Sequence, residues 1–148
     1  MMMVLDTCAW IWWRSGSGRL GRAWRERLDA VGREELVLPT ICFVETGRLA
    51  AAGELEAYPV PPAEWLEIEH QPASIRIVDL SPELALASTR LPDLAHRDPG
   101  DRIIMATAIA WDLPVLTTDR VMLAYPFVRS FSLYDVPPPE AGSDGDRS

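Results

Sequence analysis

Residues 96–120 read HRDPGDRIIMATAIAWDLPVLTTDR, and the class of fold can be inferred from them. Asp98 followed by Pro99 is a typical helix start, with a side-chain N-cap and a proline in the first turn. The apolar, alanine-rich run 103–111 then predicts a helix, and Val115–Thr117 predicts a short strand. A helix followed directly by a short apolar strand is typical of α/β proteins.

The same alternation continues outward from this stretch toward both ends of the chain. Short apolar or alternating runs predict strands, and helical spacing or N-cap signals predict helices. The expected strands cover residues 2–5, 36–38, 75–80, 115–117 and 127–131, and the expected helices cover residues 8–14, 20–30, 40–55, 62–68, 81–89 and 103–111. This pattern predicts an α/β fold, a sandwich of helices around a mostly parallel central sheet.

Length and composition are those of one small domain. The chain has 148 residues, and we expect the domain to cover residues 1–135. Residues 136–148 are rich in Pro, Gly, Asp and Ser, which predicts a disordered tail. The formal net charge of −8 argues against a protein coated in positive potential to hold nucleic acid. All 14 basic residues are arginine, which suits bidentate phosphate binding, although a compositional bias is the favoured interpretation and neither decides the function.

No apolar run approaches the roughly 18 residues that a membrane helix needs. The N-terminal run MMMVLDTCAWIWW has no basic region before it and no small-residue cleavage site, so it does not resemble a signal peptide. Cys8 and Cys42 form neither a disulfide framework nor a zinc spacing, and we interpret them as buried thiols. We therefore expect a cytoplasmic protein that does not bind membranes.

Several carboxylates fall where the crevice of such a sheet would lie. Asp6 ends the first predicted strand and Asp119 follows the strand 115–117, so both belong at the carboxyl edge, where ligands bind. Glu45 sits on an otherwise apolar helix, which is costly without a partner, and Asp101 begins another apolar helix. Converging carboxylates repel one another unless a divalent cation joins them. Oxygen-only ligands favour Mg²⁺, Mn²⁺ or Ca²⁺ over zinc, and such a site supports phosphodiester hydrolysis.

Each of these acids also has a purely structural interpretation. Asp98 and Asp101 fit the first turn of a helix with no further function, and Asp119 fits a turn or an N-cap. Glu45 could be half exposed on its helix. One residue can both cap a helix and bind a metal, so the two interpretations stay open.

The order of these motifs resembles the PIN-domain ribonuclease toxins of the VapC family. VLDTCAWIWW, residues 4–13, is similar to the family's first strand, Asp–Thr pair and helix, and residues 38–55 resemble its second acidic region. Residues 90–125 match the third and fourth regions, and their HRDP-x-D-R…ATA…L-x-T-x-D spacing is the most specific feature of the chain. The resemblance covers about residues 2–131 and implies a PIN-like α/β/α sandwich.

The resemblance also implies a function and a site. It implies an endoribonuclease that hydrolyses RNA and acts as the toxin of a toxin–antitoxin pair. The implied partner is a cognate antitoxin protein, and the implied oligomeric state is a homodimer. The implied cofactor is Mg²⁺, with Mn²⁺ as the alternative. The implied acidic quartet, catalytic and metal-binding, is Asp6, Glu45, Asp101 and Asp119, with Asp98 as an outer metal ligand. Thr7 and Thr117 occupy the family's positions beside the first and fourth acids.

Two positions depart from the family pattern. Gly100 stands where the family often has a large apolar residue, and Val44 stands where it often has tryptophan. Both positions concern packing around the acids.

Four tryptophans, Trp10, Trp12, Trp13 and Trp24, fall in the first two predicted helices. A stripe at this spacing is usually part of a core, and the alternatives are a partner surface or stacking on RNA bases. We expect Trp12 to be buried and Trp13 to be exposed. His96 is interpreted as an incidental loop residue rather than a base.

Two other functions are compatible with parts of this pattern. Haloacid-dehalogenase-like phosphatases also place a catalytic Asp after the first strand. They need a second Asp two residues later, where this chain has Cys8. They also need a catalytic lysine, and this chain has no lysine. The second alternative is a non-catalytic PIN-fold module that binds proteins. It need not be stabilised by Mg²⁺, whereas an assembled acidic site should be.

Overall fold

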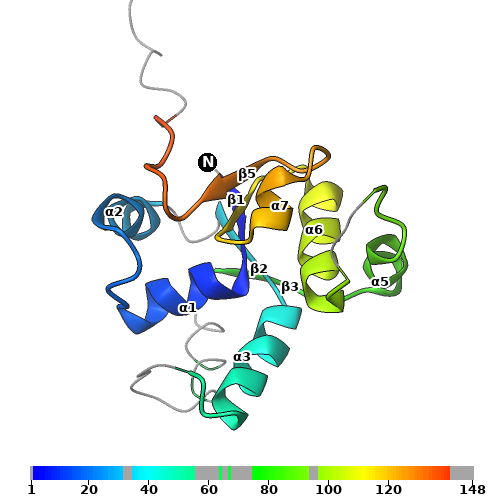
Figure 1. The fold of residues 1–148 in the computed structure, drawn as a ribbon, viewed down its shortest axis with the longest axis horizontal. Coiled ribbons are helices and arrows are strands. Elements are labelled where there is room, and N and C mark those ends of the chain that lie inside the picture. The colour runs from blue at the N-terminus through cyan, green and yellow to red at the C-terminus, as the bar shows by residue number, and fades with distance from the viewer. Residues whose placement is uncertain are drawn as a thin grey trace, which may run out of the picture.

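The computed structural model describes residues 2–31, 35–55, 64, 67, 75–93 and 97–140. Its centre is a five-stranded sheet in the order β3-β2-β1-β4-β5, in which every pairing is parallel (Figure 1). The strands are β1 Met3–Leu5, β2 Leu36–Pro39, β3 Arg76–Val78, β4 Val115–Thr117 and β5 Ser130–Ser132. The predicted parallel α/β sheet is confirmed.

Helices cover both faces of this sheet, as the predicted sandwich requires. They are α1 Thr7–Ser15, α2 Arg22–Ala30, α3 Ile41–Ala51, α5 Pro82–Ser88, α6 Pro99–Trp111 and α7 Arg120–Ala124. Figure 1 shows α1 and α2 on one side of the strands and α5 and α6 on the other. Helix α6 packs against β1, β2 and β4, and α3 contacts both α1 and α6.

The strand order reverses beside β1, and this reversal positions the functional site. The chain passes from β1 to β2 and β3 on one side, and then crosses to β4 and β5 on the other. In open parallel sheets, ligands bind beyond the carboxyl ends of the two strands that flank such a switch point. Here those strands are β1 and β4, which are followed by Asp6 and by Thr118 and Asp119.

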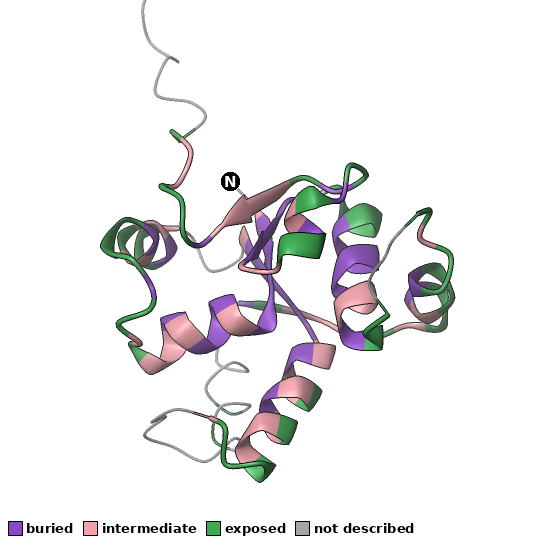
Figure 2. Cartoon of the chain, in the orientation of Figure 1, coloured by how far each residue is buried: buried purple, intermediate pink, exposed green. Residues whose placement is uncertain are grey.

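The core is built from the short strands and the inward faces of the helices (Figure 2). All residues of β1, β2 and β4 are buried. Apolar strands that are buried on both faces are the expected result when helices cover both sides of a parallel sheet. In the described part of the chain, no helix has the length and apolar character needed to span a bilayer.

The tryptophans only partly match the prediction. Trp10 and Trp24 are fully buried core residues, but Trp13 is also buried, at 7% exposure, and Trp12 is only half-buried. The expectation for Trp12 and Trp13 was therefore wrong. Its physical reason is the docking of α2: the Trp13 indole Nε1 donates a hydrogen bond of 2.8 Å to Asp29, which draws this ring between the two helices.

Other differences lie near the carboxyl end. Helix α7 was not predicted, because its single short turn follows Asp119 without an apolar repeat. The last strand begins at Ser130 rather than 127. Most of the helix predicted at 62–68 lies outside the described residues, which include only 64 and 67 of it. His96 also lies outside them.

The described chain continues to contact the domain beyond the predicted boundary at 135. Up to that boundary, the Trp24 indole Nε1 donates to the carbonyl oxygens of Ser132 and Asp135, at 3.1 and 2.7 Å. Arg27 donates to the carbonyl oxygen of Pro138 and lies 3.6 Å from the Glu140 carboxylate. A disordered tail stays a prediction, and residues 141–148 lie outside the described part.

Candidate metal centre

Asp6 lies at the switch point, where β1 ends and α1 begins. It is the N-cap of α1 and is 6% exposed. Its Oδ1 accepts a hydrogen bond of 2.7 Å from the Thr7 backbone N–H, and its Oδ2 accepts one of 2.6 Å from the Thr117 hydroxyl. Both oxygens are therefore held in place by neighbours from two adjacent strand ends.

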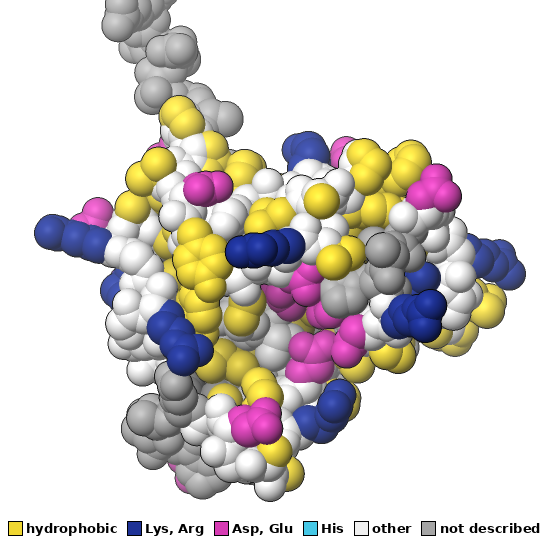
Figure 3. Space-filling model, in the orientation of Figure 1, with side chains coloured by type: hydrophobic (Ala, Val, Ile, Leu, Met, Phe, Trp, Pro, Cys, Tyr) yellow, Lys and Arg dark blue, Asp and Glu magenta, His cyan; other side chains and the backbone are white. Residues whose placement is uncertain are grey.

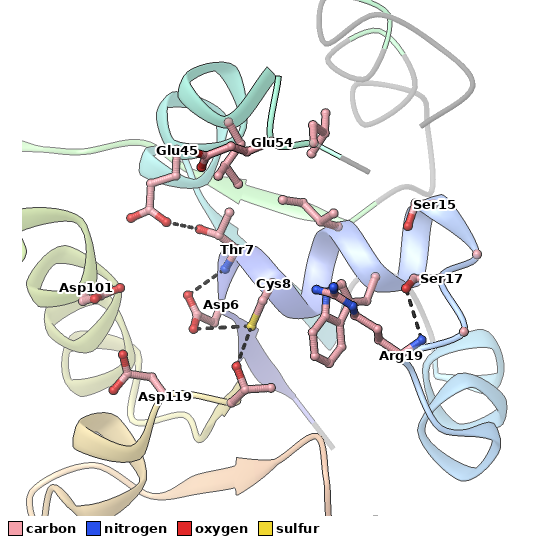
Figure 4. A pocket seen from close by; sticks show the side chains of 17 residues that line it. Asp6, Thr7, Cys8, Ser15, Ser17, Arg19, Glu45, Glu54, Asp101 and Asp119 are labelled. Atoms are coloured by element: carbon pink, nitrogen blue, oxygen red, sulfur yellow. Dashed lines mark hydrogen bonds between the residues drawn. The ribbon is translucent and has the colours of Figure 1, made fainter. Parts of the chain in front are cut away.

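Glu45 reaches the same region from α3. Its Oε2 accepts a hydrogen bond from the Thr7 hydroxyl, so Thr7 links the first two acids (Figure 4). Its other oxygen lies against Gly100 at the start of α6, where a Cβ added to the glycine would approach it to 2.0 Å. The missing side chain of Gly100 is what leaves room for this carboxylate.

The third acid is Asp101, half-buried in the first turn of α6. One oxygen each of Asp6, Glu45 and Asp101 lie within 4.8 Å of one another. These three oxygens are close enough for their side chains to bind the same divalent cation. Figure 3 shows the acidic side chains gathered in the hollow where α1, α3 and α6 meet.

Asp119 and Asp98 lie around these three acids and both cap helices. Asp119 Oδ1 accepts from the backbone N–H groups of Val121 and Met122, and Asp98 Oδ1 accepts from those of Gly100 and Asp101. Asp119 lines the same hollow as Asp6, on the side of Asp101 (Figure 4). Asp98 lines an adjoining hollow. The structural interpretation of both residues is correct, and their roles as ligands stay predictions.

The acids destabilise one another's charged forms. Burial raises the pKa of Asp6, the hydrogen bonds from Thr117 and Thr7 oppose this, and the charge of Asp119 adds to it. Burial likewise raises the pKa of Glu45, against the Thr7 hydrogen bond, and the charges of Asp6 and Asp98 raise it further. A bound divalent cation would offset these repulsions, and the all-oxygen donor set fits a hard ion such as Mg²⁺ or Mn²⁺.

Cys8 lies beside the acidic centre, but its thiol is not activated as a nucleophile. Its Sγ lies 3.7 Å from Asp6 Oδ2 and 3.5 Å from the Thr118 hydroxyl. Burial and the charge of Asp6 raise the pKa of this thiol to about 12. Cys8 is therefore protonated at neutral pH, which makes it a poor nucleophile.

Sequence reasoning placed Thr7 and Thr117 only by family position, and it missed Trp12 and Arg19 as part of the hollow. Thr117 also accepts a hydrogen bond of 2.9 Å from the Asp119 backbone N–H, so it links the first and fourth acids. The Asp–Thr and T-x-D spacings were the available signals. Arg19 had no signal, because its position depends on how the loop after α1 folds back.

Comparisons with known proteins agree with this fold. The family model of the PIN domain matches residues 3–128. Ribonuclease VapC22 of Mycobacterium tuberculosis is 28% identical over 134 residues, which cover 89% of this chain and 98% of that protein.

Solved structures of low sequence identity share the fold. A chain of DNA-bound VapBC from Salmonella typhimurium has a TM-score of 0.65 at 20% identity, over 90% of this chain and 99% of its own. A chain of FitAcB from Neisseria gonorrhoeae gives the same TM-score of 0.65, at 20% identity, over 90% and 99%.

Proposed function

This chain belongs to the PIN-domain family, and from that premise we propose that it is a metal-dependent endoribonuclease acting as the toxin of a toxin–antitoxin pair. The observation that carries the proposal is the convergence of Asp6, Glu45 and Asp101 within 4.8 Å at the switch point of a parallel sheet. The similarity to a protein named ribonuclease VapC22 supports RNA as the substrate.

Three of the residues proposed to hold the cofactor lie together in the structure, and two more are proposed from the family resemblance. Asp6, Glu45 and Asp101 would bind Mg²⁺ or Mn²⁺ directly, Asp119 would complete the quartet, and Asp98 would contribute from the rim. A bound ion of this kind polarises a phosphoryl oxygen and lowers the pKa of a water molecule.

The chain's own residues fix the geometry in which that chemistry takes place. The Thr7 and Thr117 hydroxyls hold the Glu45 and Asp6 carboxylates through hydrogen bonds, which orients their free lone pairs toward the hollow. Among the described residues that line the hollow there is no Ser–His or Cys–His pair, and Cys8 is protonated. These observations favour direct attack by water over a covalent enzyme intermediate.

A protein partner is part of the proposal. The structural relatives are chains of VapBC and FitAcB, and one solved structure is described as a toxin–antitoxin complex from Klebsiella pneumoniae. We infer that this chain also binds a cognate antitoxin in the cytoplasm, where both RNA and the partner would be available.

Cleavage of single-stranded RNA by the purified full-length chain tests the function. Activity should require Mg²⁺ or Mn²⁺ and be abolished by EDTA. Asp6→Asn should lower the rate roughly a thousandfold, because it removes a charge that holds the metal. Asp98→Asn is the matched control and should cost far less, because asparagine still caps α6.

Two results would contradict the proposal. One is full metal-dependent cleavage by the Asp6→Asn variant. The other is the absence of cleavage from a broad transcript pool by antitoxin-free wild-type protein, which would leave the non-catalytic protein-binding module as the better explanation.

A further inference from the structure

The acidic centre is one end of a longer groove. A hollow of about 760 Å³ runs from Asp6 and Glu45 along α1 to the loop that follows it. At its far end the lining includes residues 15–19, of which Ser15, Ser17 and Arg19 are labelled in Figure 4. Trp12 of α1 also lines the groove. A ligand that reacts at the acids therefore has room to extend along α1.

Trp12 differs from its neighbours in the first two helices. Trp10, Trp13 and Trp24 are buried, whereas Trp12 is half-buried and lines the groove. The Arg19 guanidinium lies 6.0 Å from the centre of its ring. An indole beside a cation, at the side of an open groove, has the elements of a nucleotide subsite, in which a base stacks on the ring and a phosphate meets the arginine.

The arginines of the two hollows differ in their surroundings. Arg19 is the one cationic side chain among the described residues that line the hollow. In the adjoining hollow of about 640 Å³, Arg48 is accompanied by four carboxylates, those of Glu45, Glu54, Asp98 and Asp101. The groove that holds Arg19 is itself lined by five carboxylates, so charge alone does not separate the two arginines. The feature that separates them is the Trp12 indole, which lies beside Arg19 and does not line the adjoining hollow.

We propose that Trp12 and Arg19 form a subsite for single-stranded RNA, in which a base stacks on the Trp12 indole and a neighbouring phosphate pairs with Arg19. Trp12 is six residues beyond Asp6, about 9 Å along α1, so the stacked nucleotide lies next to the phosphodiester at the acids. Because every base has a stacking face, the subsite should tolerate any base. The proposal rests on the ribonuclease function proposed above.

Binding can be measured without cleavage in the full-length Asp6→Asn background. The probe is a fluorescein-labelled single-stranded RNA, followed by anisotropy at several salt concentrations. Trp12→Ala should weaken binding about tenfold with no change in salt dependence, and Trp12→Phe should restore most of the affinity. Arg19→Gln should weaken binding and reduce the slope of log K against log salt by about 0.7, the loss of one phosphate contact on a single strand.

A second pair in the same chain gives a matched control. The Arg76 guanidinium lies 5.5 Å from the Trp111 ring, and neither residue lines the groove. Trp111→Ala and Arg76→Gln should therefore leave RNA affinity and its salt dependence unchanged. If Trp12→Ala does not fold, the proposal is tested by Arg19→Gln alone, through the slope of log K against log salt.

The outcomes separate this proposal from the proposed function. If wild type cleaves RNA but the Trp12 and Arg19 variants bind it like their parent, the subsite is wrong and the nuclease stands. If these variants lose only the binding of an antitoxin protein, the groove end is a protein-docking site and the subsite is again wrong. If wild type neither binds nor cleaves RNA, the proposed function itself fails.

Discussion

Replacing Gly100 with alanine tests the geometry of the acidic centre. An ideal Cβ at this position would lie 2.0 Å from Glu45 Oε1 and 3.1 Å from Asp98 Oδ1. Ordinary contact begins at 3.4 Å, so the Glu45 oxygen would have to retreat by the difference of 1.4 Å. Metal sites tolerate only about 0.2 Å in ligand distance. The added methyl group should therefore move Glu45 away from the position from which it is proposed to bind the metal.

The expected effects on metal affinity and on stability have opposite signs. A displaced ligand or ligand support typically lowers metal affinity about 10- to 100-fold. Gly100 lies in the first turn of α6 without a positive φ, so alanine fits the backbone. Alanine should stabilise the helix by up to about 1 kcal/mol. We expect the variant to melt no lower than wild type in EDTA and yet to bind Mn²⁺ weakly.

Isothermal titration calorimetry with Mn²⁺ and thermal melts in EDTA measure the two effects. Gly47→Ala is the matched control, because Gly47 lies in α3 and a Cβ added there would meet no atom within 4 Å. It should leave the Mn²⁺ affinity unchanged. Wild-type affinity in Gly100→Ala would refute the reasoning, since it would mean that Glu45 does not bind the metal from its present position.

Three further predictions concern protonation, the threonine link and assembly. Burial raises the pKa of Asp6 and Glu45, so above about pH 4 the folded chain binds more protons than the unfolded chain. The melting temperature in EDTA should therefore fall as the pH rises through the raised pKa values of these two acids. Saturating Mg²⁺ should make the melting temperature less dependent on pH. Thr117→Val should lower Mn²⁺ affinity about 10- to 100-fold, measured by calorimetry, while Thr117→Ser retains it, because only the hydroxyl links Asp6 to the Asp119 backbone. The free protein should sediment as a homodimer at tens of micromolar, and a monomeric mass there would contradict the family resemblance on this point.

Much of the fold could be predicted because its signals are local. Asp98 and Pro99 begin α6 where the sequence indicates, and Val115–Thr117 forms β4 at the predicted residues. The strand-end position of Asp6 followed from the same local pattern. Parallel pairing then brings the ends of β1 and β4 together, so the general location of the candidate site was also predictable.

What could not be predicted depends on contacts between elements. Trp12 and Trp13 are adjacent in α1, and only the docking of α2 decides which ring is buried. The close approach of Glu45 to Gly100 likewise depends on how α3 packs against α6. A sequence pattern describes one helix or strand at a time, so it cannot predict either of these contacts between elements.

The central position of β1 has a consequence for protein synthesis. Asp6 is synthesised before the hydroxyl that orients it, which belongs to Thr117, 111 residues later. At roughly 5–20 residues per second, translation of that interval takes on the order of 6 to 22 s. Through that time the nascent chain lacks β4 and cannot assemble the acidic centre. The order of the strands along the chain therefore delays assembly of the acidic centre until β4 has been synthesised.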